Sequence, residues 1–189
     1  QTGYPASNEV KITVAPDKTT QANIALRIPG WTPNAIVKVN GETMKGVASG
    51  EYYVINRQWN AGDEITLTME MPAHLVSLNQ SVAIERGPIV YARDSRFDDG
   101  FVDEVVTIPN KDGIIQMKTE ENGKDMWITV SVPMVRGTYN DASTDTRHIR
   151  LCDFASAGST WDERIRYRVW LPKLYTPDNP KSGQFQGYW

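Results

Sequence analysis

Cysteine and histidine are scarce in this sequence of 189 residues, which contains one cysteine, Cys152, and two histidines, His74 and His148. A single cysteine excludes a disulfide and a four-thiolate metal site within the chain. Neither histidine has a second histidine three or four residues away to complete a metal-binding face. The charge of Asp153 opposes formation of a thiolate at Cys152. We therefore expect Cys152 to be a buried structural residue, and we expect no cofactor in this chain.

A basic surplus and long apolar runs are also lacking. The formal net charge is −3, whereas domains that bind nucleic acid usually carry a surplus of lysine and arginine. Anionic membranes are disfavoured for the same reason. No apolar run approaches the ~18 residues of a membrane-spanning helix, and no charged and then apolar signal segment opens the sequence. We expect a soluble chain whose partners include neither nucleic acid nor a membrane.

Short alternating segments take the place of long helices. Residues 10–14, 24–28 and 65–71 alternate apolar and polar side chains with the period of two that is typical of a half-buried strand. Turn residues separate the segments, and Asn40 followed by Gly41 is a strong hairpin signal. Many short strands with frequent turns favour antiparallel β-sandwiches. The sequence therefore predicts an all-β, jelly-roll-like fold.

The segment YYVINRQWNAGDEITLTMEMP, residues 52–72, contains a strand, a turn and a second strand. Trp59 ends the first strand, and residues 60–63 supply turn chemistry, with Gly62 free to adopt a positive φ. We predict a β-hairpin with Trp59 as the aromatic anchor at its corner. Further along, Gly87 and Pro88 indicate a bulge or bend between two strand halves.

Two features near the end of the chain bear on its domains. Residues 94–104, DSRFDDGFVDE, form the densest acidic stretch and are a candidate domain boundary. Residues 164–170 alternate arginines with Ile165, Tyr167 and Val169, which predicts a final strand with a charged outer face.

Five segments together resemble the C-terminal part of glycoside hydrolase family 127, the β-L-arabinofuranosidase family that was formerly a domain of unknown function, and in particular its members from gut Bacteroidetes. The resemblance covers most of residues 1–172. These segments are LRIPGW (26–31), VKVNGE (37–42), INRQWNAGDEITLTMEMP (55–72), VAIERGPIVYA (82–92) and RYRVWLP (166–172).

In that family an N-terminal (α/α)6 barrel carries catalysis and is followed by β-sandwiches, the second inserted before the last strand of the first. The resemblance implies that residues 1–93 and 161–175 form one sandwich and that residues 94–160 form the inserted one. The prolines and glycines of residues 176–189 predict a flexible tail. The family's nucleophilic cysteine, zinc-binding residues and acid/base glutamate lie in the barrel. The resemblance therefore implies no catalytic residue in this chain.

Aromatic residues in loops are the candidate carbohydrate-binding residues, because sugars stack their C–H faces on exposed rings. Trp31, Tyr139 and Trp161 lie in such segments, although packing into the core or against a partner domain is the alternative for each. Trp59 and Trp170 end apolar strands and are expected in a core or at a domain interface.

The acidic stretch contains a weak calcium candidate, Asp98, Asp99 and Asp103, because Ca²⁺ prefers oxygen ligands. Their spacing does not match an EF-hand loop, and a solvated acidic linker is the alternative. No pair of carboxylates is singled out for glycosidase chemistry.

Three functions follow from these observations. The first is a non-catalytic accessory region that supports the N-terminal catalytic barrel of the same parent protein, which would be a glycoside hydrolase exported to the periplasm or beyond. The second is a carbohydrate-binding module for plant-derived oligosaccharides. The third, more distant, is a small independent hydrolase.

Overall fold

The computed structural model describes residues 2–135, 146–160 and 162–173. Its regular structure consists of β-strands and a single turn of 3-10 helix, η1 (Ser95–Phe97). None of the described helical structure is long and apolar enough to cross a membrane. The chain divides into two compact units, unit 1 (Gln1–Pro72) and unit 2 (Ala73–Trp189). The prediction of an all-β, antiparallel fold is confirmed.

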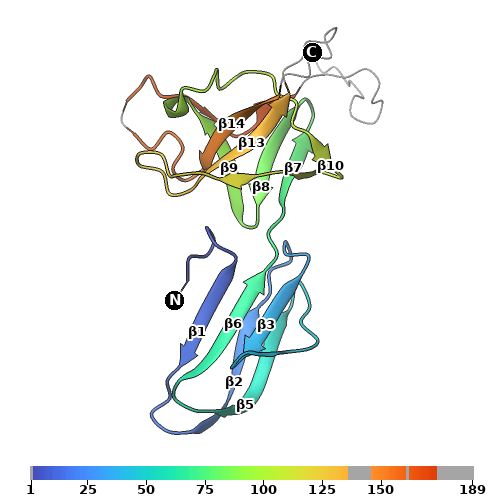
Figure 1. Cartoon of the computed structure of the whole chain (residues 1–189), viewed down its shortest axis with the longest axis vertical. Helices are drawn as coiled ribbons and strands as arrows, with labels where there is room; N and C mark the ends of the chain where they lie inside the picture. The colour runs from blue at the N-terminus through green and yellow to red at the C-terminus, as the bar shows by residue number, and fades with distance from the viewer. Residues whose placement is uncertain (1, 136–145, 161, 174–189) are drawn as a thin grey trace. The chain divides into compact units, whose positions relative to one another are not determined.

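Unit 1 contains two antiparallel sheets (Figure 1). One sheet has four strands in the order β1-β6-β3-β4, and the other pairs β2 with β5 along their whole length. The strands are β1 (Glu9–Val14), β2 (Thr20–Arg27), β3 (Ala35–Val39), β4 (Glu42–Thr43), β5 (Tyr52–Trp59) and β6 (Asp63–Met69).

The inward faces of the two sheets share one core. Val37 and Ile65 of the four-stranded sheet are completely buried, and Ile55 and Trp59 of β5 belong to the same apolar cluster. Alternate residues of each strand thus point at the facing sheet, as the period of two requires. Unit 1 is a β-sandwich.

The turn at Asn40 and Gly41 connects β3 and β4 as a two-residue hairpin. Both residues have positive φ, 51° and 85°, the conformation that such a turn needs. This prediction is confirmed.

The prediction that residues 52–72 form a β-hairpin is wrong. β5 pairs with β2, whereas β6 pairs with β1 and β3. The corner carries the chain from one sheet to the other, and Trp59 is buried there with its Nε1 donating to the Ala22 carbonyl at 3.1 Å. Asp63 closes the turn by accepting from the Asn60 amide at 2.9 Å and from Nδ2 of Asn40 at 2.8 Å.

Unit 2 is built on one large antiparallel sheet in the order β10-β11-β7-β8-β9-β14-β13-β12, with β15 added to β9 and β16 to β8 (Figure 1). The strands are β7 (Ala73–Leu78), β8 (Ser81–Arg86), β9 (Ile89–Asp94), β10 (Asn110–Lys111), β11 (Ile114–Ile115), β12 (Lys118–Thr119), β13 (Thr129–Val135), β14 (Thr146–Asp153), β15 (Tyr167–Arg168) and β16 (Leu171–Pro172).

This sheet curls, and a segment between β9 and β10 connects two of its distant strands by hydrogen bonds. The Val106 amide donates to the Pro172 carbonyl and the Val135 amide donates to the Thr107 carbonyl, each at 2.8 Å. The segment around residues 106–107 therefore links the end of β16 to the end of β13. The enclosed apolar core includes Val130, Val132, Met134, Ile149 and Leu171.

Two local predictions in unit 2 are corrected. Gly87 and Pro88 form the tight turn of the β8–β9 hairpin, with Arg86 opposite Ile89, and not a bulge. The predicted final strand is broken into β15 and β16 by a bend at residues 169–170. Tyr167 is 50% exposed instead of facing the core. Trp170 is 38% exposed and does not join a core either.

The compact units divide between Pro72 and Ala73, whereas the predicted boundary begins at Asp94. The acidic stretch folds onto unit 2, where Asp99 and Glu104 form ion pairs with the buried Arg93 at 3.6 and 3.4 Å. β15 and β16 return to pair with β9 and β8.

Replacing Trp59 tests the shared core of unit 1. Trp59→Ala should lower the free energy of unfolding by about 3–5 kcal/mol, because the change leaves a large cavity and removes the ring donor to Ala22. Tyr52→Ala, on the same strand but 66% exposed, is the control and should change it by less than about 0.5 kcal/mol. Denaturant unfolding measures both. Equal losses would contradict the assignment of Trp59 to the core.

Candidate functional site

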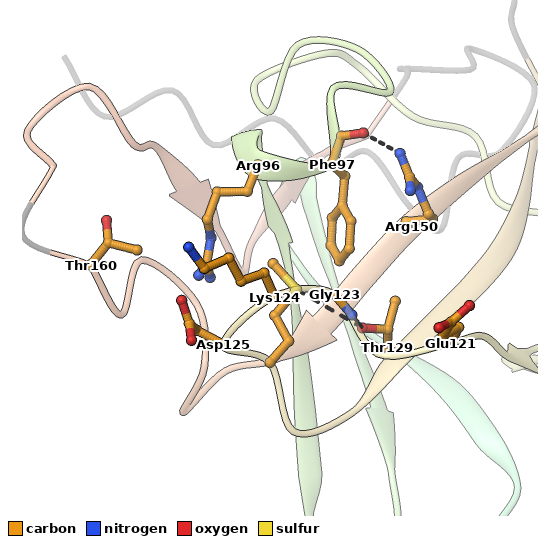
Figure 2. Close-up of a pocket in the computed structure, with 10 residues that line it drawn as sticks. Arg96, Phe97, Glu121, Gly123, Lys124, Asp125, Thr129, Arg150 and Thr160 are labelled. Atoms are coloured by element: carbon orange, nitrogen blue, oxygen red, sulfur yellow. Dashed lines mark hydrogen bonds between the residues drawn. The ribbon is translucent and has the colours of Figure 1, made fainter.

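A pocket in unit 2 has a volume of about 410 Å³. Figure 2 shows Arg96 entering it from η1 and Lys124 from the loop before β13. Glu121 and Asp125 from the same loop add two carboxylates. The lining therefore mixes cations and anions.

Arg96 is fixed by Asp94, the residue that caps η1. Both oxygens of Asp94 accept from the guanidinium, at 2.8 Å from Nε and 2.7 Å from Nη2, and one also accepts from the Arg96 amide at 2.9 Å. The Asp94 side chain is fully buried. Burial alone would raise its pKa, but the hydrogen bonds from Arg96 and from the Gly158 amide together lower the pKa below its ordinary value.

The same contacts tie the loop of residues 154–160 to the pocket. Arg96 donates from Nη2 to the Ser156 carbonyl at 2.7 Å. Asp153, also buried, accepts from the amide and hydroxyl of Ser156 at 3.0 and 2.7 Å and from the Ile128 amide at 3.0 Å. Two buried carboxylates thus hold this wall, since each is surrounded by donors.

Arg150 and Phe97 form another side of the pocket (Figure 2). The guanidinium of Arg150 lies 5.1 Å from the Phe97 ring centroid and donates to the Phe97 carbonyl. Phe97 packs with Met126 and Cys152 in a small buried cluster. The Gly123 amide donates to Oγ1 of Thr129 at 3.0 Å and fixes the neighbouring loop. Chemically, the pocket suits a small polar molecule that needs both donors and acceptors.

The three calcium candidates do not converge on one point. Asp99 pairs with Arg93 and Arg150, Asp103 pairs with Arg168, and Asp98 ends η1 in a left-handed conformation. Among the residues that the structure describes, no group of three or more His, Cys, Asp or Glu side chains is placed to hold a metal ion.

Only one of the three aromatic candidates for sugar binding lies in the described part of the chain. Trp31 is partly buried and packs against the core of unit 1, while Tyr139 and Trp161 lie outside the described residues. Sugar binding by these three stays a prediction. Trp127 and Phe154 are 51% and 50% exposed but were not predicted as candidates, because both lie in segments predicted as strands.

Cys152 is completely buried, as predicted. Burial, followed by the nearby charges of Asp94 and Asp153, raises the pKa of its thiol to about 12. The thiol is therefore protonated at neutral pH and is a poor nucleophile.

Asp94→Asn should destabilise the chain by about 3–5 kcal/mol at pH 7, because it leaves the guanidinium of Arg96 without its charge partner. The pKa of Asp94 is lowered by folding, so its contribution is present at neutral pH and is lost as the pH falls below about 4. The free energies of unfolding of Asp94→Asn and of the unchanged chain, measured with urea, should therefore become more similar as the pH falls below about 4.

The matched control for that experiment is Asp162→Asn. Asp162 and Arg164 have the same two-residue spacing and the same hydrogen bonds, at 2.9 and 2.7 Å, but Arg164 is 89% exposed. Because solvent screens an exposed pair, this change should have little effect on unfolding. An equal effect at the two sites would show that burial of Asp94 is not the cause.

Cys152 should resist alkylation in the folded chain. Iodoacetamide at pH 8 should add no mass to the native protein and one carbamidomethyl group to the urea-unfolded protein, because burial and the raised pKa both suppress the thiolate. Mass spectrometry gives the stoichiometry. Complete labelling of the native chain would rule out the buried thiol.

Comparison with known proteins places the fold. Residues 1–71 match the family model described as β-L-arabinofuranosidase, GH127 middle domain. A GH127 β-L-arabinofuranosidase from Geobacillus stearothermophilus T6 is 25% identical with a TM-score of 0.69, over 92% of this chain and 30% of that enzyme. No curated protein matches the chain.

Two further solved structures are similar in fold. A GH127 β-arabinofuranosidase is 23% identical with a TM-score of 0.70, over 92% of this chain and 31% of its own. A glycoside hydrolase is 21% identical with a TM-score of 0.64, over 93% and 32%. The chain thus spans about a third of the length of the enzymes that it matches. The resemblance seen in the sequence is confirmed: residues 1–71 match the GH127 middle domain, and 92% of the chain matches solved GH127 structures in fold.

Proposed function

We propose that the chain is a non-catalytic accessory region of a glycoside hydrolase related to the β-L-arabinofuranosidases, and that it supports an (α/α)6 catalytic barrel on the same polypeptide. One observation carries the proposal. The structural match extends over 92% of this chain but only 30% of the Geobacillus stearothermophilus enzyme, so most of such an enzyme lies outside the matched region.

The buried carboxylate of Asp94, which holds Arg96 beside the described pocket, supports a structural role. A glycosidase needs one carboxylic acid whose pKa is raised so that it can donate a proton, facing a second carboxylate across the sugar. Asp94 has the opposite property, since its pKa is lowered. Its oxygens are occupied by Arg96 and by the Gly158 amide. These groups stabilise loops and leave no lone pair on Asp94 for a substrate.

The first test is an assay of the purified chain on aryl arabinofuranosides. No hydrolysis above the uncatalysed rate is expected. Turnover that persists after repurification and is abolished by unfolding would support the independent hydrolase instead.

The second test uses the parent polypeptide with and without this region. Removing the region should lower the melting temperature or the soluble yield of the catalytic part, because a supporting surface is lost. A catalytic part with unchanged melting temperature, yield and kcat/KM would overturn the accessory role. Circular dichroism melts and initial rates provide the readouts.

A further inference from the structure

The outward face of the β2–β5 sheet in unit 1 is unusual in composition. It consists of four cross-strand pairs, which we call the amide face: Gln21 opposite Gln58, Asn23 opposite Asn56, Ala25 opposite Val54, and Arg27 opposite Tyr52. All eight residues are exposed. They are the alternate positions of two strands whose other side builds the core of the unit.

The other sheet of unit 1 shows what an ordinary solvated face looks like in this chain. Its exposed outward residues include Glu9, Lys11, Lys38 and Glu64, and Glu9 and Lys11 lie 3.8 Å apart as an ion pair. Charged residues of both signs are typical of a surface that only has to stay in water. The amide face has a single charged residue, Arg27.

Asparagine is a poor choice for the middle of a strand, because it is depleted there relative to β-branched residues. Asn23 and Asn56 nevertheless lie directly opposite each other near the centre of two eight-residue strands. Nε2 of Gln21 donates to Oδ1 of Asn56 at 2.6 Å, which joins neighbouring pairs. Residues that break a local preference without a packing gain are typical of functional sites.

The chemistry of the face selects one class of ligand. Each amide offers donors and an acceptor without charge, which suits the hydroxyl groups of a sugar. Tyr52, 66% exposed, provides a ring on which the C–H face of a sugar can stack. Six residue steps along a strand span about 20 Å, enough for several sugar units. A protein partner would find little apolar surface beyond Ala25, Val54 and the Tyr52 ring.

We propose that the amide face binds a neutral oligosaccharide, with Asn23 and Asn56 at the centre of the site and Tyr52 as the stacking platform. This binding goes beyond the accessory role and is independent of it.

The experiment is a titration of the full 189-residue chain, labelled with ¹⁵N, by arabinan-derived oligosaccharides. Side-chain NH₂ signals report directly on the four amides. We expect saturable shifts at Gln21, Asn23, Asn56 and Gln58. An oligogalacturonide of equal length is the anionic arm and should bind more weakly, because neutral hydroxyls are the expected ligands and the face has only one cation.

Variants separate binding from folding. The double variant Asn23→Thr, Asn56→Thr should keep or raise the melting temperature, since threonine is the better strand residue, and should weaken binding at least tenfold. Tyr52→Ala should weaken binding about tenfold, a typical loss for one stacked ring. Lys38→Thr, on the outward face of the other sheet, is the control and should bind as the unchanged chain does.

Several results would overturn the proposal. These are the absence of saturable amide shifts up to millimolar neutral oligosaccharide, tighter binding of the oligogalacturonide, shifts confined to the region of Trp127 and Phe154, and full binding by the double variant. A large drop in its melting temperature would also count against the proposal, because the asparagines would then serve the fold. Failure of any kind here leaves the accessory role intact, since that role is measured on the parent enzyme.

Discussion

The structure depends on one constraint, which is that each long strand has a single side that must leave water. In unit 1 the buried sides of β2 and β5 face those of β3 and β6, and Trp59 closes the corner between the sheets. In unit 2 one sheet meets the same requirement by curling on itself, with the segment around Val106 bridging its distant strands. Two different topologies therefore bury the apolar side of strands with the same alternating pattern.

The pattern explains what the sequence could predict and where it failed. Alternation identified β1, β2 and β6 as half-buried strands, because it reports the side of a strand that is buried. It does not report the pairing partner, so β5 and β6, adjacent in the chain and both apolar on alternate positions, were taken for a hairpin although they lie in facing sheets. The prediction of a turn at Asn40 and Gly41 is confirmed because a tight turn depends on local backbone conformation alone. The prediction for Tyr167 failed because alternation does not report the bend at residues 169–170, and in the folded chain its ring lies 6.1 Å from that of Phe154.

The pocket shows a similar limit for charged residues. The acidic stretch was visible in the sequence, but its partners were not, since Arg150 donates its backbone amide to Asp99 from 51 residues away. A dense acidic segment considered alone suggests a cation site or a solvated linker. In the folded chain arginines from β9, β14 and β15 neutralise it, and the segment becomes a bracing element of unit 2. Only the Asp94–Arg96 pair, two residues apart, was within reach of local reasoning.

The core of unit 1 places few demands on the side chains of its two outward faces, so the amino-acid composition of these faces can reflect requirements other than folding. The two sheets share a core and a solvent, yet one outward face carries charges of both signs and the other carries opposed amides. Stability does not account for this difference, because threonine would serve a strand better than asparagine. The contrast becomes visible only when the register is known, since Asn23 and Asn56 are 33 residues apart in sequence and directly opposite in the sheet. An accessory role for the region and a glycan-binding role for that one face are compatible, because the first depends on its fold and the second on side chains that the fold does not need.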